Sequence, residues 1–516
     1  MAEKTYDFCV VGVGACGGLL VKELSERGYS VIGLDAGPRY NPKTDIVNDE
    51  AEMLKLFWNE PRVFAGKDPV HVMSGFGVGG GTLVWCGVSP RFHESDFRTK
   101  TLDGVGEDWP ITYKDLAPYY DRVERDFGVS GRALENPLDV PRGPYPMPAI
   151  EWSWACQVMA KGVERVGARP LHGPLAITSE PYRGREACVK CGFCISGCPS
   201  TAKGCTLTDF VPRAERHGAE IRAESFVYNI TYDARKNRVT GVEYYDVNNK
   251  THRVQARVVI VSAHPMETSR LLLLSRNQTF PDGLANSSGL VGKNFMVHWD
   301  FSVYGQFEQR LNAYKGPIMG NLMVQDWYET DPKRDFARGY VLESFLPHPF
   351  YFGVAGPVFW GPPLKEMIKA YDHTAGWWVT GESLPNDNNT ITLDPDVKDH
   401  RGLPVVRSTH EWSDNDKRMM KHAAQNAVAT LEAAGARKTY VGVTMSAHPM
   451  GTARMGSNPR KSVVNSYCQS HDIPNLFVCD PSVMVTGSGV NHTLTAMALT
   501  SRAGEYMVEA ARRGDL

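Results

Sequence analysis

The sequence carries almost no net charge. Its 516 residues include 56 basic and 58 acidic side chains, which leaves a formal charge of -2. Because neither sign is in excess, no bulk field draws the chain toward nucleic acid or anionic lipid. Internal repeats and low-complexity tracts are also missing, and 42% apolar with 22% charged residues exclude a disordered or fibrous protein. A globular chain of this length allows about two to four domains, or one large interleaved enzyme.

Uninterrupted hydrophobic runs are missing as well. Three stretches without Asp, Glu, Lys or Arg are long enough to raise the question of a membrane, at 69–90, 344–364 and 481–501. The first is broken by a run of glycines, the second by five prolines, and the third by glycine, asparagine and histidine. A strand pattern begins at Tyr6, so residues 1–4 leave no room for an export leader. We therefore expect no membrane-spanning segment and no signal peptide.

The cysteines do not indicate a disulfide framework. Their number, 11, is odd, and five of them gather between 188 and 205. This distribution favours metal or redox chemistry. Four of the five follow the spacing of bacterial ferredoxin ligands: Cys188, Cys191, Cys194 and Cys198. Soft thiolates at this spacing favour an iron–sulfur cluster, with zinc or no metal as the alternatives.

The sequence does contain a dinucleotide-binding fingerprint near its start. A strand at 6–11 is followed by a turn that contains Gly12, Gly14 and Gly17. A helix to residue 27, a second strand at 30–34 and the acid Asp35 come next. Gly12 permits the tight turn, Gly14 lets the backbone approach a pyrophosphate, and Gly17 lets helix and strand pack closely. The helix N-terminus offers N–H donors to the phosphates, and Asp35 is placed to accept from a ribose hydroxyl. The unit predicts an adenine dinucleotide site.

The other patterns predict a chain of the α/β (α+β) class. A second glycine cluster at 75–82 precedes a packed Leu-Val-Trp segment, as expected where a backbone passes close to a flat ligand. Periodicity predicts further elements: an antiparallel hairpin in 221–245, a buried strand at 254–262, and helices at 263–275 and 417–434. We expect the aromatic-rich stretch 296–415, including a strand at 390–393, to form the sheet that faces the substrate.

Four motifs occur in the order typical of one enzyme family. They are the unit at 12–35, the cluster Gly79-Gly80-Gly81-Thr82, the segment 258–273, and Ser446-Ala447-His448-Pro449-Met450-Gly451-Thr452. With them the chain resembles the glucose-methanol-choline (GMC) flavoprotein oxidoreductases. It looks most like their sugar-oxidising members, which include glucose dehydrogenase catalytic subunits, pyranose oxidases and glycoside 3-dehydrogenases.

The resemblance implies a particular domain organisation. It comprises a Rossmann-like FAD-binding domain assembled from separated segments and a substrate domain built on an antiparallel sheet. We expect the FAD domain at 1–130, 205–295 and 440–516, the substrate domain at 296–439, and an excursion carrying the cysteines at 131–204.

The resemblance also implies the residues of the site. An alcohol gives a hydride to FAD and a proton to a base, and a neutral imidazole suits the second task. His448 matches the family's active-site histidine, and Asn491 matches the group that hydrogen-bonds the substrate oxygen, with His492 beside it as a further candidate. Pyranose oxidases tether FAD through a histidine where Val84 stands here, so FAD should be non-covalent. The expected FAD contacts are Gly12, Gly14, Gly17, Asp35, Gly80, Thr82, Asp480 and Asn491.

The cysteine segment and the partners follow from the same resemblance. Glucose dehydrogenase subunits hold a three-iron cluster on three cysteines, whose spacing maps onto Cys188, Cys194 and Cys198 and leaves Cys191 as an extra ligand. A [3Fe-4S] cluster is therefore favoured over [4Fe-4S]. The implied function is an FAD-dependent sugar or glycoside dehydrogenase with a small partner subunit and a cytochrome or quinone-type acceptor. Its location would be cytoplasmic, or periplasmic if it is exported with that partner.

Two other functions stay open. One is an oxygen-using sugar or glycoside oxidase without a cluster. The other is a flavin and cluster electron-transfer subunit with no substrate of its own. The sugar, and oxidation at the anomeric or the third carbon, also stay open.

Overall fold

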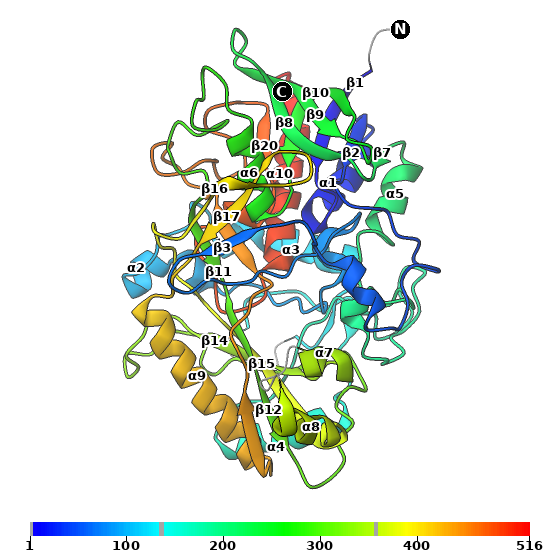
Figure 1. The fold of residues 1–516 in the computed structure, drawn as a ribbon, viewed down its shortest axis with the longest axis vertical. Coiled ribbons are helices and arrows are strands. Elements are labelled where there is room, and N and C mark those ends of the chain that lie inside the picture. The colour runs from blue at the N-terminus through cyan, green and yellow to red at the C-terminus, as the bar shows by residue number, and fades with distance from the viewer. Residues whose placement is uncertain (1–3, 134–138, 355–359) are drawn as a thin grey trace.

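The computed structural model describes residues 4–133, 139–354 and 360–516 (Figure 1). Residues 134–138 of the expected excursion, and Pro357 in the stretch 344–364, lie outside the described residues. Among the described helices, none is long and apolar enough to cross a membrane.

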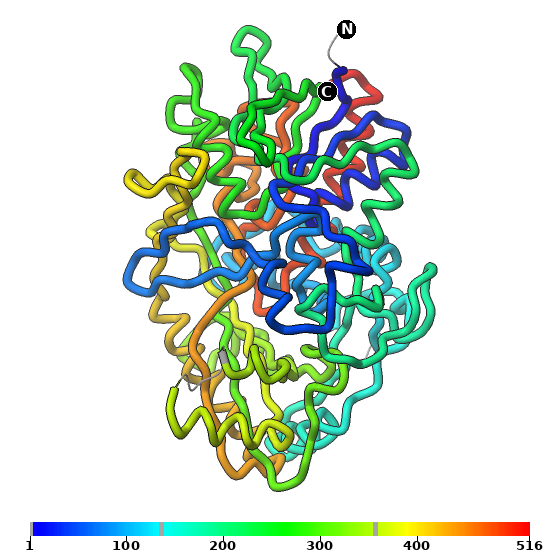
Figure 2. The backbone as a smooth tube through the Cα atoms, turned by 45° about the vertical axis from the view of Figure 1, so that its right-hand side comes forward, coloured from blue at the N-terminus to red at the C-terminus, as the bar shows by residue number. Residues whose placement is uncertain are grey.

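A seven-stranded sheet forms the nucleotide half. Its order is β7-β2-β1-β10-β9-β8, with β20 beside β10, and β1, β2, β7, β10 and β20 run parallel. The bounds are β1 Thr5–Val11, β2 Val31–Leu34, β7 Glu220–Arg222, β8 Phe226–Asp233, β9 Arg238–Tyr245, β10 Thr251–Val261 and β20 Leu476–Val478. Strands from the start, middle and end of the chain meet in this sheet, so the predicted assembly from separated segments is confirmed (Figure 2).

Helices cover this sheet because its strands are buried apolar runs. Helix α1 (Ala15–Ser25) packs against α5 (Phe210–Arg216) and α10 (Thr493–Arg513), and α10 packs against α3 (Tyr113–Phe127). Nearly every side chain of α1 is buried, including Lys22, which forms an ion pair with Asp126. Helix α6 (Pro265–Leu274) packs on β8 and on strands of a second sheet.

A six-stranded antiparallel sheet forms the other half. Its order is β18-β12-β15-β14-β13-β6: Lys438–Val441, Trp299–Gln306, Thr374–Gly381, Tyr340–Phe345, Met319–Val324 and Leu171–His172. Side chains alternate between its faces. One face, with Trp299 and Trp377, packs on α9 (Asp414–Ala433) and α4 (Trp154–Arg165). The opposite face, with Tyr304 and Trp378, joins the core of the nucleotide half.

A third sheet has five strands, which come from widely separated parts of the chain. Its order is β19-β11-β16-β17-β3: Pro449–Thr452, Lys293–Val297, Thr390–Lys398, Pro404–Thr409 and Val63–Ala65. The strand predicted at 390–393 exists as part of β16, but it pairs with β11 and β17 here and not in the six-stranded sheet. Pairing partners are set by long-range contacts, which periodicity does not report. The domain boundaries stay a prediction.

The remaining elements are short. They are α2 Thr99–Asp103, α7 Pro349–Val354, α8 Gly361–Lys369, β4 Ser130–Gly131, β5 Met147–Pro148, and the 3-10 turns Glu52–Leu56, Gly80–Leu83, Glu94–Phe97, Cys194–Ser196, Tyr371–His373 and Pro481–Val483.

Candidate active site

The glycine turn after β1 is too crowded for any side chain. Gly12 has φ +89°, and a Cβ there would lie 2.3 Å from the Ser262 carbonyl oxygen. A Cβ on Gly17 would lie 1.9 Å from the carbonyl oxygen of Gly12. Gly80, at φ +50°, passes Gly14 so closely that its Cβ would be 2.8 Å from the Gly14 Cα. The two glycine clusters therefore form one cradle of bare backbone, as a flat phosphate-bearing cofactor requires.

Asp35 ties this turn to the next loop. Its carboxylate accepts hydrogen bonds from the backbone N–H groups of Val13 at 2.9 Å and Gly37 at 3.0 Å. Burial raises the pKa of Asp35, and these two hydrogen bonds lower it in part. Since a carboxylate has about four lone-pair sites, it can still accept from a ribose hydroxyl.

A cavity of about 310 Å³ runs from this cradle toward the six-stranded sheet. Seven of the eight predicted FAD contacts line it: Gly12, Gly14, Asp35, Gly80, Thr82, Asp480 and Asn491. His448 lines it as well. Gly17 does not line it and instead supports Gly12 from behind. Val84 and Trp85 also line the wall, so the residue at the tethering position faces the cavity. These residues fit FAD.

His448 belongs to a chain of hydrogen bonds that defines its tautomer. His298, at the end of β11, lies with its Nδ1 3.1 Å from Nδ1 of His448 and its Nε2 3.2 Å from the carbonyl oxygen of Gly487. A carbonyl only accepts, so Nε2 of His298 carries the proton and its Nδ1 offers a lone pair. Nδ1 of His448 must then be the donor. This leaves the lone pair of His448 on Nε2.

The imidazoles around this chain are held neutral. Burial lowers the pKa of His448 well below its usual value, and the neighbouring His298 and His492 add to the effect. Burial likewise lowers the pKa of His298 to about 4 and that of His492 to about 3. The ring centroids of His448 and His492 lie 5.3 Å apart. His492 lines the cavity, and neither of its ring nitrogens has a hydrogen-bond partner.

Asn491 and His492 stand just before the first residue of α10. Helix α10 begins at Thr493. Both side chains are buried, and the Asn491 Oδ1 atom has no partner. The structure thus brings the three predicted residues, His448, Asn491 and His492, to one end of the cavity.

Sequence reasoning missed three residues near His448. They are His298, Asp300 on β12 and Glu343 on β14, each 0% exposed. Asp300 Oδ2 lies 3.6 Å from Nδ1 of His448. Glu343 is the one charged residue in its strand, and burial raises its pKa to about 8. A single acid inside a wholly buried strand was the signal that could have found it.

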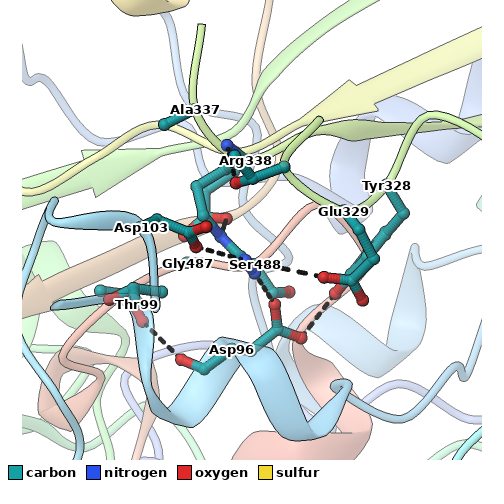
Figure 3. A network of polar contacts seen from close by, with 12 residues as sticks. Asp96, Thr99, Asp103, Tyr328, Glu329, Ala337, Arg338, Gly487 and Ser488 are labelled. Carbon is teal, nitrogen blue, oxygen red and sulfur yellow. Dashed lines mark hydrogen bonds and ion pairs between the residues drawn. The ribbon is translucent and has the colours of Figure 1, made fainter. Parts of the chain in front are cut away.

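The loop 486–491 is anchored by a buried ionic network (Figure 3). Arg338 is 1% exposed and binds Glu382 at 2.8 Å, Asp103 at 3.1 Å and also Asp96. The carbonyl oxygen of Asp96 accepts from the Thr486 hydroxyl at 3.2 Å. The same network thus fixes the loop that presents the Gly487 carbonyl to His298.

The cysteine segment packs against the cavity wall. Lys203, which is fully buried, donates from Nζ to the carbonyl oxygens of Leu83, Trp85 and Cys194 at 3.0, 2.9 and 2.6 Å. Across the residues that the structure describes, the only group with metal-ion spacing is His298, Asp300 and His448, so the four thiols do not gather around one ion. A tetrahedral zinc ion would hold its sulfurs about 3.8 Å apart, from a Zn–S distance of ~2.3 Å. The expected metal centre is therefore not evident from the positions of the thiols.

Comparison with known proteins identifies the family. The N-terminal sequence profile of GMC oxidoreductases matches residues 6–300 and the C-terminal profile matches residues 385–500. The chain belongs to the GMC oxidoreductase family, as the resemblance predicted.

Its relatives are full-length matches. The 2-methyl-1,2-propanediol dehydrogenase of Mycolicibacterium austroafricanum is 32% identical, over 98% of this chain and 95% of the relative. The fructose dehydrogenase large subunit of Gluconobacter japonicus is 30% identical, over 98% of each. The solved structure of pyridoxine 4-oxidase from Mesorbium loti has the same fold, with a TM-score of 0.71 at 16% identity over 98% of this chain and 99% of that chain. The protein is thus an FAD-dependent oxidoreductase of the CH–OH groups of alcohols and sugars.

Proposed function

We propose that this protein is a dehydrogenase that oxidises a secondary or anomeric hydroxyl of a sugar or glycoside, with His448 as the base. The observation that carries the proposal is the hydrogen-bond chain from the Gly487 carbonyl through His298 to His448. It leaves Nε2 of a neutral, cavity-lining imidazole free to take a proton. FAD, when bound, accepts the hydride that leaves the same carbon.

Each residue has one task in this proposal. His448 removes the hydroxyl proton at Nε2, and its Nδ1–H stays bonded to His298. Asp300 lies with Oδ2 3.6 Å from that Nδ1; burial raises its pKa well above the usual value, and a proton gained by His448 would favour its ionised form. Asn491 binds the substrate oxygen, and Val84 leaves FAD without a covalent tether.

For the exit of electrons we propose an iron–sulfur cluster held by Cys188, Cys194 and Cys198, with Cys191 as a further ligand. Two contacts support it: backbone N–H groups donate to the sulfur of Cys188 at 3.4 Å and of Cys198 at 3.3 Å. Such donors stabilise thiolates. A cluster there would pass electrons singly from the flavin side of the cavity to an external acceptor.

The relatives support an external acceptor and a partner. Both of those described above are named dehydrogenases, and one of them is named a large subunit. We propose that this chain binds a small partner subunit and passes electrons to a cytochrome or quinone-type acceptor. Export together with the partner would place it in the periplasm.

The test of the base is His448→Ala in the FAD-loaded enzyme. Reduction of the flavin by sugar, measured without air, should slow by roughly 100- to 10,000-fold with FAD still bound. His410→Ala is the control, because His410 is a buried histidine (1% exposed, against 15% for the His448 side chain) that bonds to the Asp68 carbonyl, away from the cavity. Normal flavin reduction in the His448 variant would place the base elsewhere.

The test of the cluster is separate. Cys194→Ser should lose iron and the broad visible absorbance while sugar still reduces the flavin in a single turnover. Cys191→Ser should be harmless with three irons and damaging with four. Wild-type protein purified without air that contains no iron would refute the cluster and leave oxygen or a small acceptor at the flavin.

A further inference from the structure

The six-stranded sheet gives the cavity an apolar wall. Met319 on β13, Phe345 on β14 and Trp378 on β15 all line the cavity. Met319 pairs across the strands with Phe345, and the rings of Phe345 and Trp378 meet edge to face with their centroids 5.1 Å apart. These three side chains, called here the apolar wall, therefore form one continuous surface.

A second apolar contribution comes from outside the sheet. Tyr351 of α7 and Met73 also line the cavity. The Tyr351 hydroxyl donates to the sulfur of Met73 at 3.2 Å, so it is already engaged within the protein. What Tyr351 offers to a molecule in the cavity is its ring.

The apolar wall lies near the reacting end of the cavity, where His448, Asn491 and His492 meet. Asp300 pairs with Thr380 on β15, which makes Asp300 and Trp378 diagonal neighbours on adjacent strands. Such neighbours are about 7–8 Å apart. Since Asp300 Oδ2 lies 3.6 Å from Nδ1 of His448, a molecule about the size of a sugar ring can reach from the base to the wall.

Polar atoms are unevenly divided between these two regions. Asn491 Oδ1 and both ring nitrogens of His492 have no partner, so they can bind hydroxyl groups beside His448. The apolar wall contributes a single polar atom, the unpaired Nε1 of Trp378. A buried hydroxyl without a partner costs free energy, so the part of a substrate that rests on the wall is best without hydroxyls.

We propose that the apolar wall is a subsite for an aromatic aglycone. This rests on the proposed function and deepens it: the substrate is a glycoside that carries an aryl group, and a free sugar is the poorer substrate. The aryl ring packs against Phe345 and Trp378, where aromatic pairs gain energy beyond the area that they bury. The sugar ring then lies between the wall and His448.

The proposal also decides which carbon is oxidised. In a glycoside the anomeric carbon is an acetal and has no free hydroxyl. A secondary hydroxyl of the ring must therefore react, with its proton passing to Nε2 of His448 and the hydride of the same carbon passing to bound FAD. The bond to the aglycone stays intact, and a ketone forms on the sugar ring.

The experiment compares phenyl and methyl glycosides of the same sugar in the FAD-loaded enzyme. Pairs are made on glucose, galactose and xylose in both anomers, and the three free sugars are measured beside them. Flavin reduction is followed without air, and the rate at low substrate gives one specificity constant for each compound. In the pair that reacts fastest, we expect the phenyl glycoside to exceed the methyl glycoside by about 10-fold or more, as burial of one aromatic ring predicts.

Variants then locate the preference. Phe345→Ala should reduce the phenyl-to-methyl ratio at least about 5-fold, and Met319→Gln, which keeps the side-chain length but adds an amide, at least about 3-fold. Phe301→Ala is the matched control, because Phe301 is a buried phenylalanine of the same sheet that packs on the opposite face. Its ratio should equal that of the wild type even if its stability falls. If neither wall variant folds with FAD, the comparison of glycosides in the wild type decides.

Three outcomes would overturn the subsite. Equal constants for the phenyl and methyl glycosides would remove the preference, and a wild-type ratio in both wall variants would place it elsewhere. Flavin reduction by free sugars but by none of the glycosides would favour the anomeric carbon and leave the proposed function standing. If neither sugars nor glycosides reduce the flavin, the proposed function fails and the subsite falls with it, so the two failures are distinguishable.

Discussion

The tautomer of His448 depends on His298, and a pair of substitutions can test this. His298→Phe keeps the ring volume but removes both nitrogens, so the Nδ1–H of His448 loses its acceptor at 3.1 Å. Leaving a buried donor unpaired costs ~1–3 kcal/mol. At about 1.4 kcal/mol per factor of ten, flavin reduction should slow roughly 5- to 150-fold. Asp300 Oδ2, at 3.6 Å, offers a substitute acceptor, which places the effect toward the lower end.

His298→Asn separates the acceptor from the rest of the ring. An asparagine Oδ1 occupies about the place of the histidine Nδ1 and can accept from His448, but no atom reaches the Gly487 carbonyl. We therefore expect this variant to recover much of the rate that His298→Phe loses.

The assay is anaerobic stopped-flow reduction of bound FAD, with His410→Phe as a buried-histidine control. If His298→Phe reduces its flavin at the wild-type rate with FAD in place, the hydrogen-bond chain does not set the reactive state of His448.

Four further predictions concern the loop network, Glu343 and the FAD site. Arg338→Lys should slow flavin reduction and lower the free energy of unfolding by ~1.5–3 kcal/mol, because it loses one charge-assisted hydrogen bond. Arg91→Lys, in a similar buried network around Glu124, should lower the stability alone. Equal rates of flavin reduction in the two variants would contradict this. Glu343 has a pKa raised from 4.5 to about 8. The folded state holds this proton more tightly than the unfolded state does. The contribution of Glu343 to the free energy of unfolding therefore falls as pH rises from 4.5 to 8, by up to ~5 kcal/mol (3.5 units at 1.36 each). Glu343→Gln should flatten that slope in denaturant titrations at pH 5 and pH 8. Gly80→Ala should push the Gly80 and Gly14 backbones apart and weaken FAD binding at least about 10-fold, measured by the fluorescence of the released FAD. Acid should release intact FAD from the wild type. Flavin retained on the precipitated protein would contradict the non-covalent site.

Local pattern was sufficient for the first strand-turn-helix unit of the nucleotide half. The strand, the turn at Gly12, Gly14 and Gly17, and helix α1 are decided by residues close together in the chain, and their periodicity and glycine spacing report those contacts directly. The hairpin of β8 and β9 and the long helix α9 could be predicted for the same reason. The family resemblance then added His448 and Asn491, which no local pattern distinguishes from ordinary buried polar residues.

The tertiary structure decided which groups surround those residues. His298 stands 150 positions before His448, and only the pairing of β11 with β19 brings the two imidazoles together. Asp300 and Glu343 become neighbours because β12 and β14 flank β15, a register that period-two alternation alone does not specify. The sequence by itself determined that an FAD-binding oxidoreductase would form. The order of the strands, fixed by long-range packing, determined which buried acids and imidazoles lie beside the reacting end of its cavity.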